Sequence, residues 1–210
     1  MSTKVLKIDS VLLDLENPRI SRSSSQREAL QKIIADQGGK VAVLAESIVE
    51  SGLNPMDRLL IIRSAEAKSK FTVIEGNRRL AALKILNNPA VLDGLTVRPG
   101  LQRRLEATAS RYDGSIESLP CYELADRAEG AMWIRQRHSG ENGGRGIVNW
   151  GGVASARFRG SNPALQALDF VLAHGDLTEE DQAEIDDGFP ITTLGRLLAT
   201  TDVQARTCRT

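Results

Sequence analysis

Residues 71–86 read FTVIEGNRRLAALKIL and join two elements of different periodicity. The first five residues are mostly apolar and β-branched, which predicts a strand. From Leu80 onward a leucine recurs at every third position, which predicts a helix over residues 77–86, and Pro89 lies just beyond its end. A single glycine, Gly76, connects the strand to the helix. This strand–glycine–helix junction is the feature around which the first two thirds of the chain is organised.

The junction is a candidate anion site, because the first N–H groups of a helix lack intrahelical partners and carry the positive end of the helix dipole. Arg78 and Arg79 lie in the first turn, where positive charge is unfavourable unless an anion offsets it. Guanidinium groups match phosphate oxygens through paired hydrogen bonds. Two interpretations remain open: a bound phosphate, or a structural ion pair of these arginines with Glu75 or another carboxylate.

The rest of the sequence predicts a mixture of strands and helices. Ser25 and Glu28 have the spacing of a capping box, and Thr178 precedes acidic residues at another helix start. Pro120 marks its run as an edge or terminal strand. Strands are predicted at residues 5–8, 58–63, 71–75 and 119–124, and helices at residues 26–34, 41–50, 77–86, 101–109, 125–137, 153–158, 163–174, 178–185 and 192–200.

This order of elements predicts an α+β fold, in which a small mixed sheet is flanked by helices and followed by an all-helical C-terminal region. The expected domains are residues 1–150 and residues 151–210. A glycine-rich loop over residues 138–146 precedes the boundary. The chain ends soon after an apolar helical segment, which predicts a shortened member of a longer family.

Several stretches, taken in order, resemble the N-terminal domain of ParB-like proteins in the ParB/sulfiredoxin superfamily. They are Asn17-Pro18-Arg19, residues 44–52, Pro55, residues 59–62 and residues 71–86. The resemblance covers roughly residues 5–150 and implies a sheet of the ParB/sulfiredoxin type. In that family the box matched by residues 76–82 holds the triphosphate of a nucleotide. The nucleotide is CTP in the chromosome-partition members, and related members hydrolyse ATP, phosphorylate small molecules or act as nucleases.

The resemblance also implies a set of site residues. A later family box, Glu-Asn followed by a basic residue, is matched within the glycine-rich loop. The expected nucleotide-binding residues are Gly76, Asn77, Arg78, Arg79, Asn142 and Arg145; the expected metal ligands are Glu141 and Asn142; and the expected catalytic residues are Glu75, Glu141 and His138. Carboxylate and amide oxygens suit Mg²⁺.

Two features of these boxes leave alternatives open. Asn77 stands where the arginine box usually has Glu, and Glu75 is the nearby carboxylate that replaces it. The alternative for Glu141 and Asn142 is a purely structural role, in which their side chains stabilise a turn of the glycine-rich loop and bind no metal.

The composition excludes several other classes of protein. Cys121 and Cys208 lack the spacing of a zinc site or a disulfide framework, and aromatic residues at 4% argue against a base-stacking RNA surface. The absence of a long apolar run argues against a membrane span and a secretory signal, so a cytoplasmic location is expected. Basic and acidic residues number 27 each, so no net charge attracts the chain to DNA.

The charges are nevertheless unevenly distributed. Residues 76–104 contain six basic residues against one acidic residue, whereas residues 160–188 contain eight acidic residues and neither Lys nor Arg. The expected DNA phosphate contacts are Arg98, Arg103, Arg104, Arg135, Arg137 and Arg145. The alternative is that these arginines pair with the acidic segment, within the fold or across a dimer.

Three functions follow as hypotheses. The first is a nucleotide-dependent switch or weak nucleoside triphosphatase (CTPase or ATPase) linked to DNA, with CTP or ATP and Mg²⁺ as ligands. The second is a metal-dependent nuclease, and the third is a non-catalytic DNA-associated adaptor. A two-metal nuclease needs clustered anionic ligands, and only Glu75 and Glu141 lie near the predicted site, which favours the switch. We further expect a homodimer, weak sequence preference on DNA, no membrane partner and a bacterial, plasmid-related or phage-related origin.

Overall fold

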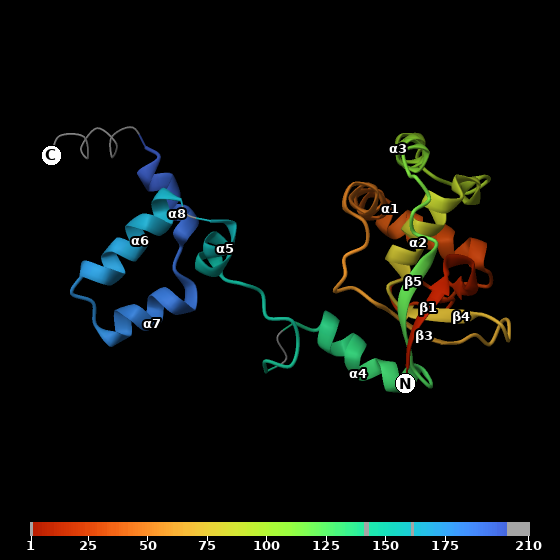
Figure 1. The fold of residues 1–210 in the computed structure, drawn as a ribbon, viewed down its shortest axis with the longest axis horizontal. Helices are drawn as coiled ribbons and strands as arrows, with labels where there is room; N and C mark the ends of the chain where they lie inside the picture. The colour runs from red at the N-terminus through yellow and green to blue at the C-terminus, as the bar shows by residue number, and fades with distance from the viewer. Residues whose placement is uncertain (1, 141–142, 161, 201–210) are drawn as a thin grey trace. The chain divides into compact units, whose positions relative to one another are not determined.

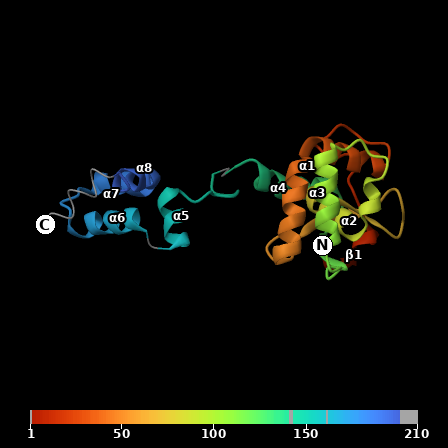
Figure 2. The same ribbon diagram turned by 90° about the horizontal axis from the view of Figure 1, so that it is seen from above.

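The computed structural model describes residues 2–140, 143–160 and 162–200 (Figure 1). The chain divides into two compact units, Met1–Arg137 and His138–Thr210. Figure 2 shows the same elements from a perpendicular direction. The expected domain boundary at residue 150 stays a prediction, because compactness alone does not delimit a functional domain. Within the described ranges, no helix is long and apolar enough to cross a lipid bilayer.

The first unit contains a five-stranded sheet with the strand order β1-β5-β3-β4-β2. Its strands are β1 (Ser2–Lys7), β2 (Val11–Leu12), β3 (Leu59–Arg63), β4 (Phe71–Glu75) and β5 (Ser118–Glu123). The β1–β5 and β3–β4 pairs are antiparallel, whereas the β3–β5 and β2–β4 pairs are parallel. The predicted α+β class with a small mixed sheet is confirmed.

β5 is not an edge strand, contrary to the expectation from Pro120, because it lies between β1 and β3. Its pairing with β3 begins at Cys121, one residue after the proline, while Pro120 lies opposite Val5 of β1. At Pro120 itself the strand therefore has a paired neighbour on one side only. A proline is tolerated at such a position because its missing N–H breaks no ladder on the other side.

α1 (Gln26–Ser51) consists of two helical segments that join at a kink, in the region where two helices were expected. The side-chain oxygen of Ser25 accepts a hydrogen bond from the backbone N–H of Glu28, as the capping pattern predicted. The helix crosses a kink at Gln37, whose φ is −129°. The predicted gap between residues 34 and 41 is thus a local distortion and not a loop.

The kink is next to a close helix contact. A Cβ on Gly38 would lie 2.4 Å from Cδ2 of Leu101, which belongs to α3 (Pro99–Ser110). Glycine at this position lets α3 approach α1 closely. A larger residue at this position would push the two helices apart.

The main core lies between the sheet and three helices: α1, α2 (Asn77–Asn87) and α3 (Figure 1). The leucines of α2 that recur every third residue are all buried, and Val73 of β4 is fully buried among them. Ile74 follows Val73 and therefore points to the opposite face of the sheet. There it meets α4 (Arg127–His138), since a Cβ on Gly130 would lie 2.5 Å from Cδ1 of Ile74.

The second unit is helical in its described part and has a small core of its own. Its helices are α5 (Gly152–Arg159), α6 (Pro163–His174), α7 (Glu179–Gly188) and α8 (Ile191–Leu198). Ala156, Ala164, Leu168 and Ile191 form the core. Thr178 caps the start of α7, as predicted from the sequence, and Asp181 completes a reciprocal capping box with it.

Candidate functional site

The junction at Gly76 is the N-terminus of α2. Gly76 is the N-cap residue and has a left-handed conformation, with φ 103° and ψ 19°. A Cβ here would lie 2.3 Å from Cδ2 of Leu59, so glycine allows β3 to approach the turn. No side chain in the described part of the chain caps this terminus. Its first-turn N–H groups therefore remain available to an external acceptor.

Arg79 lies over this terminus and is largely buried, with its side chain 13% exposed. Its Nη2 atom is 2.8 Å from Oδ2 of Asp57. Its Nη1 atom is buried and has no hydrogen-bond partner among the described residues. This atom is near the glycine, because it would lie 3.4 Å from a Cβ on Gly76. Burial lowers the pKa of Arg79, and the negative charge of Asp57 opposes that shift.

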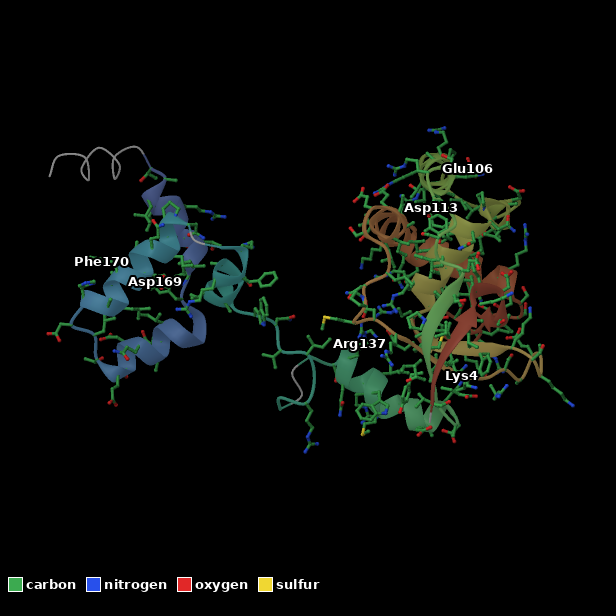
Figure 3. The ribbon with its side chains drawn as sticks, viewed as in Figure 1. Lys4, Glu106, Asp113, Arg137, Asp169 and Phe170 are labelled. Atoms are coloured by element: carbon green, nitrogen blue, oxygen red, sulfur yellow. The ribbon has the colours of Figure 1, made fainter. Side chains whose placement is uncertain are left out.

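A second arginine converges on the same carboxylate. Arg137, labelled in Figure 3, lies near the C-terminal end of α4. Its Nη2 atom contacts Oδ1 of Asp57. Its Nε atom is also 3.8 Å from Oε1 of Glu75 at the end of β4. The ion-pair interpretation of this region is therefore realised in this structure for Arg79, with Asp57 and not Glu75 as the partner. The electrostatic result is two guanidinium groups and two carboxylates beside one helix N-terminus.

Arg78 and Asn77 differ in exposure and in the contacts that they make. Arg78 is exposed, and its Nη1 is 3.5 Å from Oε1 of Gln37 at the kink of α1. Asn77 is buried, and both ends of its amide are used: Oδ1 accepts from the N–H of Asp14 at 2.9 Å, and Nδ2 donates to the carbonyl of Val73 at 3.3 Å. The group that Asn77 retains for a ligand is its backbone N–H.

The remaining predicted site residues lie outside the described residues or in the second unit. Glu141 and Asn142 lie outside the described residues. His138 is the last residue of α4, and Arg145 is exposed in a turn; both belong to the second unit. Across the described ranges, no group of three or more His, Cys, Asp or Glu side chains is arranged to hold a metal ion. The clustered ligands of a two-metal nuclease are therefore not formed by the described residues.

Sequence reasoning missed the role of Asp57 and assigned Arg137 only to DNA. Asp57 lies in the irregular segment before β3, outside any apolar period, and 80 residues separate it from Arg137. Nothing local in the sequence indicates this contact. The nearest signal is the excess of positive charge around Gly76, which requires a counter-anion from elsewhere in the fold.

Two of the predicted DNA-contacting arginines pair with carboxylates inside the first unit. Arg104 donates to both carboxylate oxygens of Glu46, at 2.7 and 2.6 Å, and Arg137 contacts Asp57. This pairing raises the pKa of Arg104 and lowers that of Glu46. Their partners are not in the acidic segment at residues 160–188, so the expected alternative pairing does not account for them.

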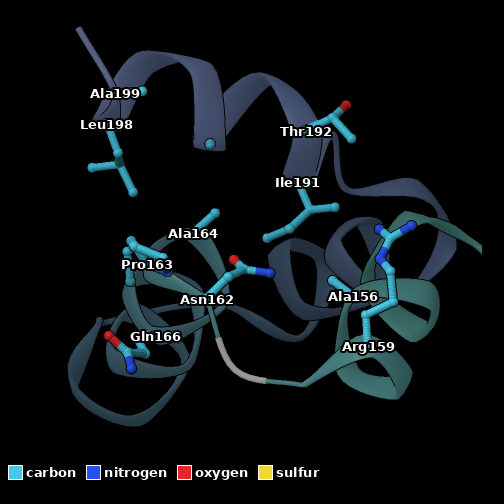
Figure 4. Close-up of a pocket in the computed structure, with 12 residues that line it drawn as sticks. Ala156, Arg159, Asn162, Pro163, Ala164, Gln166, Ile191, Thr192, Leu198 and Ala199 are labelled. Atoms are coloured by element: carbon cyan, nitrogen blue, oxygen red, sulfur yellow. The ribbon is translucent and has the colours of Figure 1, made fainter.

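A separate groove of about 830 Å³ lies in the second unit, between α5, α6 and α8 (Figure 4). Small side chains line much of it, among them Ala156, Ala164 and Ala199, together with the polar side chains of Arg159 and Asn162. None of the predicted site residues lines this groove. The charged groups and the unfilled helix terminus are at α2, which is therefore the candidate site.

No protein-family model matches this sequence, and no curated protein matches it. The solved structures that are similar to the chain include two of the C-terminally truncated chromosome-partitioning protein ParB from Caulobacter crescentus. The complex with CTP-γ-S is 19% identical with a TM-score of 0.38, and the match covers 98% of this chain and 83% of that one. The complex with the centromeric parS site is 15% identical with a TM-score of 0.30, over 96% and 75%. CTP-γ-S and parS are ligands of those proteins. At these identities and TM-scores the similarity of the chain to both ParB structures is distant.

Proposed function

We propose that this protein binds a nucleoside triphosphate at the N-terminus of α2 and acts as a nucleotide-dependent switch linked to DNA. The observation that carries the proposal is the buried Nη1 atom of Arg79, which has no partner among the described residues and lies beside Gly76. Such an unsatisfied donor costs about 1–3 kcal/mol. A ligand oxygen at this place would remove that cost.

Phosphate is the ligand group that fits this environment best. The helix terminus offers backbone N–H donors and a positive dipole end. Arg78, Arg79 and Arg137 add guanidinium groups, which bind phosphate oxygens through charge-assisted hydrogen bonds. Several phosphates in a row would use all three arginines, so a triphosphate is a better match than a single phosphate.

The proposed metal and catalytic groups come from the sequence motifs. Glu141 and Asn142 would hold Mg²⁺, with Arg145 and Asn142 on the nucleotide, and Glu75, Glu141 and His138 would serve any hydrolysis. CTP is a first nucleotide to test because the ParB protein in one similar structure is complexed with CTP-γ-S. ATP is another, because the sequence resemblance implies CTP or ATP as the ligand. A weak triphosphatase and a non-hydrolysing switch differ only in whether bound nucleotide turns over.

Isothermal titration calorimetry with CTP, ATP, GTP and UTP, with and without Mg²⁺, tests the proposal. We expect one of them to bind, and Arg78→Ala to weaken binding about tenfold to a hundredfold, because a charge-assisted contact contributes about 1.5–3 kcal/mol. Arg78 is exposed, so this change leaves the fold intact. The control is Arg22→Ala, at an arginine whose side chain is 81% exposed. Equal affinity in Arg78→Ala and the parent chain, or no nucleotide binding at all, would overturn the assignment.

A further inference from the structure

Asp57 uses both of its carboxylate oxygens on the arginines of the candidate site. Oδ2 accepts from Nη2 of Arg79 at 2.8 Å, and Oδ1 accepts from Nη2 of Arg137. The carboxylate is half-buried, with its side chain 22% exposed. An anionic group of the chain itself therefore occupies the place where two cationic side chains meet beside the N-terminus of α2.

We propose that Asp57 is a specificity-determining residue of this site, where its carboxylate takes the position of one phosphate group and excludes weakly charged anions. The inference rests on the proposed nucleotide function. A ligand must displace Asp57 from Arg79 and Arg137 before it binds. A nucleoside triphosphate carries enough charge to do so, whereas a monophosphate does not.

The geometry of this ion pair and the charge of the ligand explain why a phosphate can replace Asp57. Each carboxylate oxygen of Asp57 contacts one arginine, and the contact to Arg79 is made through Nη2. The Nη1 atom of Arg79 has no partner among the described residues. A terminal phosphate has three free oxygens and a larger negative charge, so it can replace both contacts of Asp57 and also satisfy Nη1.

The position of Asp57 in the chain allows this displacement. It lies in the short segment between α1 and β3, outside the regular elements, and its backbone N–H donates to the carbonyl of Asn54 in a turn. The neighbouring Met56 is exposed. The carboxylate can therefore turn toward water by side-chain rotation, without breaking a strand or a helix.

The test compares the parent chain, Asp57→Asn and Asp113→Asn by calorimetry. Each is titrated with the nucleoside triphosphate that the parent chain binds and with its monophosphate. Asp113→Asn is the matched control, because it makes the same change of charge in the loop before β5. We expect Asp57→Asn to bind the triphosphate about tenfold more tightly and the monophosphate by a larger factor, so that the preference for triphosphate falls. The control should match the parent chain.

The outcomes separate this inference from the proposed function. Nucleotide binding by the parent chain, with unchanged affinities in Asp57→Asn, overturns the role of Asp57 and leaves the nucleotide site standing. No nucleotide binding by any of the three proteins overturns both. If Asp57→Asn does not fold, a crystal structure of the parent chain with nucleotide decides. A phosphate oxygen on Arg79 with Asp57 turned away supports the inference, and a retained 2.8 Å contact in the presence of bound phosphate overturns it.

Discussion

The carboxylate of Asp14 is fully buried and accepts hydrogen bonds from two guanidinium nitrogens of Arg127, the first residue of α4. One of its oxygens also accepts the backbone N–H of Glu16 at 2.9 Å. The N–H of Asp14 donates to Asn77 at the start of α2. This buried charge therefore connects α4 to the loop beside the candidate site.

Removing Arg127 should destabilise the first unit strongly. Arg127→Ala leaves the carboxylate of Asp14 buried without its cationic partner, and breaking a buried pair in this way costs about 3–5 kcal/mol. Because Arg127 is itself 39% exposed, we expect a smaller loss of about 2–3 kcal/mol. Urea unfolding at neutral pH measures the change, with Arg22→Ala as the control. Equal stability of the two variants would contradict this account of Asp14.

Gly76→Ala should destabilise the fold and weaken any ligand binding at α2. The new Cβ would meet Leu59 at 2.3 Å, and the left-handed φ of 103° is unfavourable for alanine. Together these effects cost about 1–3 kcal/mol. Gly100→Ala is the matched control, since it adds a Cβ in open space within α3 and should stabilise the chain by a few tenths to about 1 kcal/mol. Thermal unfolding measures the melting temperature, which should fall for Gly76→Ala and rise for Gly100→Ala. A lower melting temperature in both variants would contradict a specific requirement for glycine at position 76.

Glu28 should make a pH-dependent contribution to stability. Hydrogen bonds from Lys32 and then from Ser24 lower its pKa from 4.5 to about 2. Because the folded-state pKa is below the unfolded one, the contribution is complete above pH 4.5 and is lost as the pH falls toward 2. The difference in melting temperature between the parent chain and Glu28→Gln should therefore shrink across this interval. A difference that stays constant down to pH 2 would show that Glu28 does not titrate in this way.

Any hydrolysis of nucleotide should depend on Mg²⁺ and on Glu141. A carboxylate that binds Mg²⁺ near a triphosphate loses most of its affinity for the ion when it is replaced by a neutral amide. We expect Glu141→Gln to lower the turnover at saturating nucleotide, and excess Mg²⁺ to restore part of it if the residue is a metal ligand. Phosphate release measures the rate, and Glu180→Gln in α7 is the control. If Glu141→Gln turns over nucleotide as fast as the parent chain, Glu141 has no role in hydrolysis and the glycine-rich loop is only structural.

Binding to random duplex DNA should be weak and sensitive to salt. The balanced net charge and the internal pairing of Arg104 and Arg137 leave few arginines for phosphates. Each phosphate contact contributes about 0.9 to the log–log salt slope, so we expect a slope of only about −2 to −5. Fluorescence anisotropy over a salt series, with and without nucleotide, measures it. If no complex forms even at low salt, the link to DNA is wrong and a nucleotide-responsive protein-binding module remains.

Local patterns anticipated the elements of this fold well where a short-range rule applies. The Ser25 and Thr178 caps, the strand before Gly76 and the helix after it all depend on contacts within a few residues. The expectation failed where a distant neighbour decides. β5 is internal because it pairs with β1 as well as with β3.

The sequence by itself determined the α+β class, the glycine turn and the two arginines at a helix N-terminus, because capping, periodicity and the backbone freedom of glycine act locally. Only the tertiary structure decided which anion Arg79 contacts, namely Asp57, which Arg137 also contacts. Asp57 and Arg137 are 80 residues apart in the chain and come together because the segment before β3 and the end of α4 reach the same helix terminus. Burial then left Nη1 of Arg79 without a partner among the described residues, and burial is a property of the packed fold and not of a sequence motif.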